Sequence, residues 1–116
     1  MISLNREKNL VDDYVVFDLE TTGFDPKTSK IIEIGALKYR NNELVDELSL
    51  LVNPGCPIPD VITMITGIDD ELVKNAISIE EALPQFITFI EDLPLVAHNS
   101  KFDLSFIEEN IQALKL

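Results

Sequence analysis

The sequence predicts a single mixed α/β domain in which strands precede most of the helices. The chain has 116 residues, enough for one hydrophobic core and too few for two. Apolar residues make up 46% of the chain and charged residues 26%, as in average globular proteins, so a disordered or membrane-embedded chain is not expected. Runs with the pattern of strands come first, and two apolar stripes with helical spacing follow.

The first expected strand covers residues 14–20. Its continuous apolar run is rich in β-branched and aromatic residues, which is typical of a buried strand. Two further strands are expected over residues 30–39 and 43–52. Asn41 and Asn42 lie between them and suit a tight turn, so these runs predict an antiparallel hairpin beside the first strand.

Two helices are expected next. A Pro-rich loop leads into a short helix over residues 60–66, and Gly67 occupies the usual position after a helix end. Ser78 followed by Glu81 predicts a capping box for the second helix. Pro84 strains that helix near its start, but the apolar stripe outweighs this strain. The stripe consists of Ile79, Leu83, Phe86, Ile87 and Ile90.

The C-terminal part is expected to form a short buried strand over residues 95–97 and a last helix over residues 101–112. Asn99 or Ser100 can cap this helix. Its expected inner side consists of Phe102, Phe106, Ile107 and Ile111. No repeat, low-complexity tract or linker interrupts the chain, which predicts one domain over residues 1–116.

The charge balance limits how this chain can meet nucleic acid. Nine Lys and Arg residues face 21 Asp and Glu residues, which gives a formal net charge of −12. Proteins that bind nucleic acid mainly through its phosphates need Lys and Arg on their surface, so the net charge argues against a DNA-binding module. Any nucleic-acid activity must act locally, through cations held at an acidic site, or with a basic surface supplied by a partner or another segment.

The N-terminal residues, the single cysteine and the spacing of the acids limit the location and the class of this protein. Residues 1–13 carry several charges and no continuous apolar run, so neither a signal peptide nor a membrane span is expected, and a cytoplasmic location follows. The single cysteine, Cys56, can form no disulfide within the chain and is interpreted as an ordinary loop thiol. An acidic calcium-binding protein is excluded because no Asp-x-Asp/Asn-x-Asp/Asn-Gly loop occurs.

Asp18-Leu19-Glu20 lies at the end of the most apolar strand. Because side chains alternate along a strand, both carboxylates are expected on one face, about 7 Å apart along the backbone. Acid-x-acid triplets arise by chance in so acidic a chain, and the one at residues 69–71 is interpreted as a solvated helix start. The strand context distinguishes Asp18 and Glu20, since like charges beside an apolar run are costly without a cation or a proton.

A third acid, Asp103, falls in the first turn of the last expected helix, just after a buried strand. Strand ends of this kind are where α/β folds build sites. Two interpretations stay open: Asp103 belongs to a site, or it only complements the helix dipole. His98 precedes it, and a lone histidine at a strand end is more often a hydrogen-bonded structural group than a base.

Two longer motifs resemble those of the DEDDh (DnaQ-like) exonucleases, a family that includes proofreading exonucleases of bacterial replicative polymerases and ribonuclease T. The first motif is Phe-Asp-Leu-Glu-Thr-Thr-Gly at residues 17–23, and the second is His-Asn-Ser-Lys-Phe-Asp at residues 98–103. Residues 31–35 and 66–68 also resemble the family at the expected spacing. The resemblance implies a ribonuclease H-like mixed sheet flanked by helices with its C-terminal part missing, so that residues 1–116 form one incomplete exonuclease domain.

The resemblance implies 3′-to-5′ exonuclease activity on nucleic-acid 3′ ends, chiefly single-stranded or frayed DNA, in proofreading or repair. Asp18, Glu20 and Asp103 correspond to three of the four acids that hold two Mg²⁺ or Mn²⁺ ions in the family. One ion would generate a hydroxide, and the other would stabilise the leaving 3′ oxygen. Residues similar to the family's terminal-nucleotide pocket are Thr21, Thr22, Thr66, His98, Asn99 and Phe102. For Thr66 a purely structural role as a helix end stays open, and for Phe102 a role in the core.

Two departures from the family pattern matter. Val61 stands where family members often carry an acid that helps to seat the 3′ end. The family's third motif, His-x-x-x-x-Asp, supplies a general base and the fourth acid, and this sequence reaches Leu116 without it; its one histidine, His98, matches the second motif instead. The chain alone is therefore expected to be inactive. The alternative function is a truncated or degenerate non-catalytic module that binds a polymerase or helicase partner.

Overall fold

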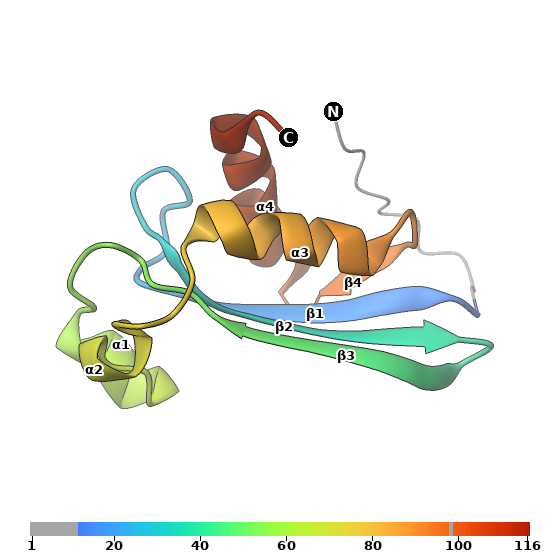
Figure 1. Ribbon diagram of the computed structural model, residues 1–116, viewed down its shortest axis with the longest axis horizontal. Coiled ribbons are helices and arrows are strands. Elements are labelled where there is room, and N and C mark those ends of the chain that lie inside the picture. The colour runs from blue at the N-terminus through green and yellow to red at the C-terminus, as the bar shows by residue number, and fades with distance from the viewer. Residues whose placement is uncertain (1–11, 98) are drawn as a thin grey trace.

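A computed structural model of the protein describes residues 12–97 and 99–116. Figure 1 shows the long strands side by side, with the helices and the short strand β4 beside them. The elements in chain order are β1 (Tyr14–Thr21), β2 (Ile31–Arg40), β3 (Glu43–Leu51), α1 (Asp60–Thr66), α2 (Asp70–Val73), α3 (Ile79–Ile90), β4 (Leu95–Ala97) and α4 (Ser100–Leu114). This order confirms the mixed α/β prediction.

The four strands form one mixed sheet in the order β3-β2-β1-β4. β2 runs antiparallel to both β1 and β3, whereas β4 runs parallel to β1. The turn between β2 and β3 places Asn41 and Asn42 at φ 53° and 62°, a left-handed conformation that asparagine tolerates and that matches the twist of a hairpin. The predicted hairpin is therefore confirmed, with its turn at the predicted residues.

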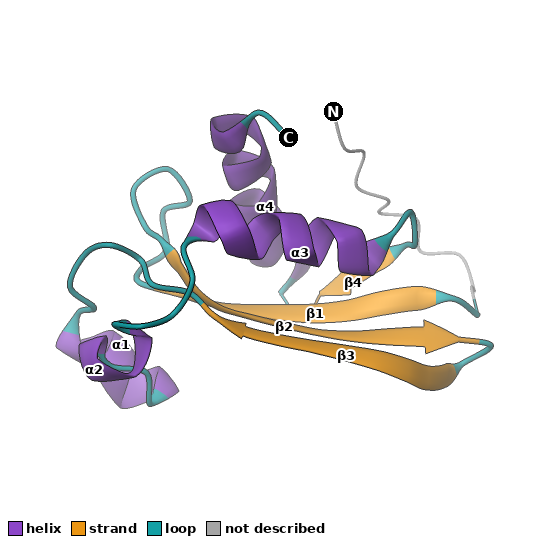
Figure 2. Ribbon diagram, in the orientation of Figure 1, coloured by secondary structure: helices purple, strands orange, loops and turns teal. Residues whose placement is uncertain are grey.

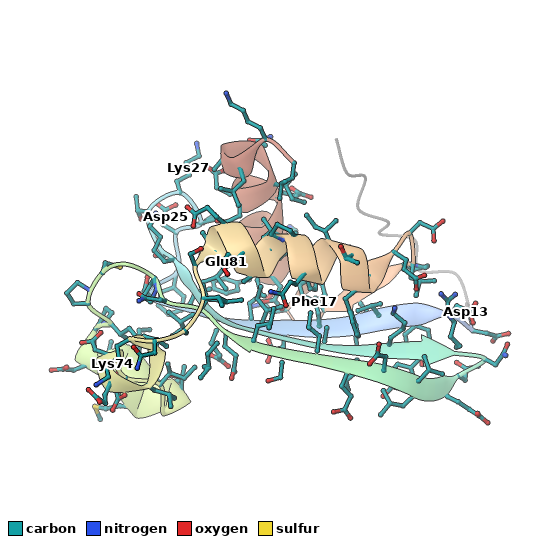
Figure 3. All side chains as sticks on the ribbon, viewed as in Figure 1. Asp13, Phe17, Asp25, Lys27, Lys74 and Glu81 are labelled. Atoms are coloured by element: carbon teal, nitrogen blue, oxygen red, sulfur yellow. The ribbon has the colours of Figure 1, made fainter. Side chains whose placement is uncertain are left out.

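Figure 2 shows α3 and α4 on one face of the sheet, and no described helix covers the opposite face of the long strands. Val15, Phe17 and Leu19 alternate along β1 toward these helices and are at most 4% exposed. Phe17 points from β1 toward α3 (Figure 3), where its ring centroid lies 5.3 Å from that of Phe86. The intervening β1 side chains, which include Asp18 and Glu20, lie on the uncovered face.

A second, smaller core forms beneath α1 and α2. It contains Ile32, Ile58, Ile62, Ile68 and Val73. Ile32 reaches it because the β1–β2 register shifts between Glu20 and Thr21: Glu20 pairs with Glu33, but Thr21 pairs with Ile31. α1 ends at Gly67 in the left-handed conformation (φ 78°), as predicted, and the Asp69 side chain caps α2 by accepting a 2.8 Å bond from the Leu72 N–H.

Ion pairs join the far end of β2 to the end of α3. Lys38 Nζ lies 3.0 Å from Glu91 Oε2, and Arg40 lies 2.7 Å from the same oxygen. Arg40 also reaches Asp13 at 3.3 Å. Glu91 has a positive φ of 54°, which is strained for a residue other than glycine, so these two cations hold a strained helix end in place.

Three local predictions need correction. Ser78 and Asn99 occupy the N-cap positions of α3 and α4, but neither side chain makes the predicted capping bond. At α3, the Ser78 backbone carbonyl instead accepts from Glu81 N and Ala82 N. β4 is only partly buried, because Val96 lies opposite Val16 at the edge of the described sheet and is 47% exposed.

Among the described helices, none is long and apolar enough to cross a membrane.

Replacing Phe86 by Ala is expected to destabilise the chain by about 3–5 kcal/mol, because it leaves a cavity beside Phe17 in a fully buried position. Urea unfolding followed by circular dichroism measures the loss. Phe24→Ala is the matched control, since Phe24 is 81% exposed and its removal should change stability by no more than about 0.5 kcal/mol. Equal losses in the two variants would refute this assignment of the core.

Candidate active site

The parallel pairing of β1 and β4 brings two distant sequence motifs together. β4 pairs with Val15, Val16 and Phe17, so Asp18 and Glu20 lie on the part of β1 that continues past the end of β4. The chain then enters α4, whose first residue is Ser100. Carboxyl ends of neighbouring parallel strands, with the helix start that follows, are the usual place for a site in such folds.

The two acids of β1 share the uncovered face of the sheet, as predicted from the strand alternation. Asp18 is exposed, and its Oδ1 accepts a 3.0 Å hydrogen bond from the N–H of Leu19. Glu20 is half-buried and stands directly opposite Glu33 of β2. A groove of about 350 Å³ opens beside Asp18, between β1 and β3, so this carboxylate borders a hollow.

The pKa of Glu20 shows which acids lie near it. Burial raises this pKa above its ordinary value of 4.5, and the negative charges of Asp18, Glu33 and Asp103 raise it further. Asp103 belongs to α4, so the fold brings the three predicted acids, Asp18, Glu20 and Asp103, into one neighbourhood. It adds Glu33, which the sequence analysis did not single out.

Asp103 is buried, with 1% of its surface exposed. Its Oδ2 accepts a 3.4 Å hydrogen bond from the backbone N–H of Asn99, and so closes the first turn of α4. An acid that only complements a helix dipole works as well at the surface. Burying a carboxylate is costly, and the N–H of Asn99 is one of the partners that offset this cost. The assignment of Asp103 to the site stays a prediction.

The threonines of the first motif shape the loop after β1. The hydroxyl of Thr21 donates to the carbonyl of Gly23 at 2.6 Å. The hydroxyl of Thr22 accepts from the backbone N–H of Lys30 at 2.9 Å, and Thr22 N donates to the carbonyl of the same residue. These bonds close residues 22–30 into a loop at the end of β1, on the side where α4 begins (Figure 1).

The remaining predicted pocket residues have different surroundings. The hydroxyl of Thr66 donates to the Ile62 carbonyl at 2.8 Å and accepts from Ile68 N at 3.1 Å, contacts typical of a helix end, and its place in the pocket stays a prediction. Asn99 is exposed at the start of α4. His98 lies outside the described residues.

An aromatic series extends from the core to the surface beside the acids. Phe102 is partly buried, with its ring centroid 4.9 Å from that of Phe106 and 6.3 Å from that of Phe24. Phe24 itself is 81% exposed. The sequence analysis missed Phe24; an aromatic residue directly after Thr-Thr-Gly was the available signal. A hollow of about 580 Å³ between α3 and the β2–β3 hairpin is lined by none of the predicted site residues.

The donor chemistry fits a hard divalent cation. Carboxylate oxygens are the ligands that Mg²⁺ and Mn²⁺ prefer, and a cation would offset the negative charges that raise the pKa of Glu20. Within residues 12–97 and 99–116, however, no three Asp, Glu, His or Cys side chains converge closely enough to hold an ion. The residue types therefore suit a divalent cation, although the described side chains do not form a group close enough to coordinate it.

A family model described as an exonuclease matches residues 15–115. The chain belongs to this exonuclease family. The match includes both motifs that carry Asp18, Glu20 and Asp103, and it confirms the family resemblance predicted from the sequence. The four-stranded mixed sheet of this chain has the ribonuclease H-like fold of these exonucleases.

Curated relatives are PolC-type DNA polymerases III. The chain is 48% identical to the polymerase of Caldanaerobacter subterraneus subsp. tengcongensis over 116 residues, which is 100% of this chain and 8% of that protein. It is 48% identical to the polymerase of Clostridium perfringens over 106 residues, 91% of this chain and 7% of that protein. The chain thus spans less than a tenth of the length of these relatives.

Solved structures agree on the fold. Apo exonuclease I matches with a TM-score of 0.80 and 13% sequence identity, over 89% of this chain and 25% of that one. A product-bound structure of exonuclease I matches equally well, over 89% of this chain and 26% of that one. At this identity, the likeness concerns the fold alone.

Replacing Glu20 by Gln is expected to raise the stability of the metal-free chain at pH 7. The gain should stay below about 1 kcal/mol, since the carboxylate is partly exposed and solvent screens its repulsion. A folded pKa raised above 4.5 means that ionised Glu20 costs stability as the pH rises through and above that value, and that the cost disappears at lower pH.

Chemical unfolding of both chains at pH 7 and at about pH 4 tests this prediction, and the difference should shrink at the lower pH. Glu43→Gln removes the same charge from an exposed position at the hairpin end of β3 and should show no such pattern. If Glu20→Gln proved less stable than the wild type at pH 7, the acidic neighbourhood described here would be wrong.

Proposed function

We propose that this chain is the part of a metal-dependent 3′-to-5′ exonuclease that carries its first catalytic acids, and that it releases nucleoside monophosphates from DNA ends during replication. The observation that carries the proposal is the grouping of Asp18, Glu20 and Asp103 at one edge of the sheet in a member of an exonuclease family. Its similarity to PolC-type DNA polymerases III supports a role in replication, in proofreading or repair of 3′ ends.

The three acids are proposed to hold two divalent cations, Mg²⁺ or Mn²⁺. Such bound cations supply an activated water and positive charge beside the leaving oxygen of a phosphodiester. The exposed Asp18 would reach the cations directly, whereas the buried Asp103 would anchor them against α4. A zinc-bound form of an exonuclease I complex with single-stranded DNA is known, which supports cation binding by this fold.

The terminal nucleotide is proposed to lie against the loop after β1. The hydrogen bonds of Thr21 and Thr22 hold that loop in place, and exposed Phe24 with Phe102 gives an aromatic surface on which a base can stack. Asn99, at the start of α4, adds to the proposed pocket, and the assignment of His98 and Thr66 to it stays a prediction. Complexes of E. coli exonuclease I with dA16 and dT13 oligonucleotides support a single-stranded or frayed substrate.

The proposal also covers the contact with DNA, the partner and the location of the chain. A net charge of −12 leaves little basic surface to hold a duplex, so contact with DNA is proposed to be limited to a few terminal nucleotides held through the cations. A polymerase or helicase is the proposed partner, and the cytoplasm the proposed location. The PolC-type relatives support the polymerase in particular.

One observation favours a second candidate function. The one histidine among these 116 residues, His98, matches the second motif, so neither the base nor the fourth acid of the third motif has been assigned to a residue. A non-catalytic exonuclease-like module that binds a polymerase or helicase would retain the fold without these groups. The two predictions that follow separate this module from the enzyme.

Replacing Asp18 by Ala is expected to reduce cleavage to background in a longer form of the protein that continues through the third motif. The fold should remain intact or become slightly more stable, because the change removes one of the charges that raise the pKa of Glu20. Mononucleotide release from a 3′-labelled single strand and thermal unfolding measure the two effects. Cleavage at the wild-type rate would show that Asp18 is not a cation ligand.

The polypeptide of residues 1–116 alone is expected to show no cleavage above background in Mg²⁺ or Mn²⁺. A general base typically contributes about 10²- to 10⁴-fold, and poorly positioned cations reduce the rate further. The longer form should restore the activity, and its Asp18→Ala variant controls for a contaminating nuclease. The expectation fails if residues 1–116 release mononucleotide robustly and lose this activity on Asp18→Ala.

A further inference from the structure

Glu33 of β2 has no assigned role, yet it lies at the proposed active site. In the β1–β2 pairing it stands directly opposite Glu20. Its neighbour Ile34 is fully buried toward α3 and α4, so Glu33 points to the uncovered face that carries Asp18 and Glu20. Like charges directly opposite each other in an antiparallel pair destabilise a sheet. The pairing therefore requires a reason other than stability.

No ion pair between described residues includes Glu33. The ion pairs that involve residues 12–97 and 99–116 engage Lys38, Arg40 and Lys74. At the other end of the same strand, Lys38 and Arg40 are both paired with Glu91. β2 thus carries ion-paired cations at its hairpin end, whereas Glu33, at its site end, takes part in no ion pair between described residues.

The backbone around Glu33 is firmly anchored. Ile32 and Ile34 flank it and are both 0% exposed, but they enter different cores: Ile34 packs under α3 and α4, and Ile32 in the cluster with α1 and α2. The register shift immediately beside the Glu20–Glu33 pair allows this divergence. Such bulges frequently lie next to active sites, where they orient a side chain. Glu33 is consequently held across from Glu20 by two buried neighbours.

We propose that Glu33 is a positioning residue for the divalent cations held by Asp18, Glu20 and Asp103, acting on them through water and through its charge on Glu20. The inference rests on the function proposed above. A water-mediated role fits the geometry because Glu33 faces the group from the neighbouring strand, directly opposite Glu20. It also fits the chemistry, since Mg²⁺ retains several waters when bound, and carboxylates beyond the direct ligands orient such waters.

The test is a Mn²⁺ titration of the 116-residue chain, followed by paramagnetic broadening of its amide NMR signals. In the wild type, broadening is expected first around residues 18–20, 33 and 103. Glu33→Gln should require about tenfold more Mn²⁺ for the same broadening, the lower end of the effect typical of residues that support metal ligands. Glu33→Asp keeps the charge and should titrate closer to the wild type than Glu33→Gln does.

Two further variants make the outcome decisive. Glu43→Gln removes an equal charge from the hairpin end of β3 and should titrate as the wild type does. Asp18→Asn should lose the localised broadening. If Asp18→Asn loses it while Glu33→Gln titrates like Glu43→Gln, the role of Glu33 is refuted and the proposed function stands. If the wild type shows no localised broadening, or Asp18→Asn retains it, the cation site fails and the role of Glu33 fails with it.

Discussion

The packing of one face of β1 against α3 and α4 is the constraint on which the rest of the structure depends. Val15, Phe17 and Leu19 are almost completely buried, so a shift of β1 by one residue would expose them and drive Asp18 and Glu20 into the core. β2 on one side and β4 on the other hold that register. The apolar alternation that builds the core therefore also fixes the face on which the acids lie.

Charged side chains have different surroundings at the two ends of the sheet. At the hairpin end, Lys38 and Arg40 neutralise Glu91 across the gap between β2 and α3. At the opposite end, Glu20, Glu33 and Asp103 lie near one another, no ion pair between described residues includes Glu33, and the neighbouring charges raise the pKa of Glu20. Proteins commonly depart from maximal stability at functional sites, and this end of the sheet is where the chain does so.

Local patterns predicted much of the fold. The strand of Asp18, the hairpin with its Asn41-Asn42 turn and the helix ended by Gly67 were all correct, because alternation, turn chemistry and helix-end chemistry are short-range properties. Features that depend on residues far apart in the sequence could not be predicted from local patterns. The exposure of Val96 depends on which strand lies beside β4, a pairing that no local pattern encodes.

The candidate site was predicted in part for the same reason. The motifs identified Asp18, Glu20 and Asp103, but the burial of Asp103 follows from how α4 packs. Glu33 was lost among 21 acids because its significance lies in the β1–β2 register. Phe24 was missed because an isolated surface aromatic belongs to no periodic pattern. The remaining predictions for the nucleotide pocket include His98, which lies outside the described residues.

The ion pairs of Lys38 and Arg40 also shape the field that surrounds the molecule. These two cations are occupied within the fold, so they contribute little attraction to an approaching polyanion, and the net charge of −12 repels it. Added salt shortens the range of that repulsion, to about 8 Å at physiological ionic strength. Single-stranded DNA would therefore encounter this surface faster as the salt concentration rises, the reverse of the kinetics that basic DNA-binding proteins display.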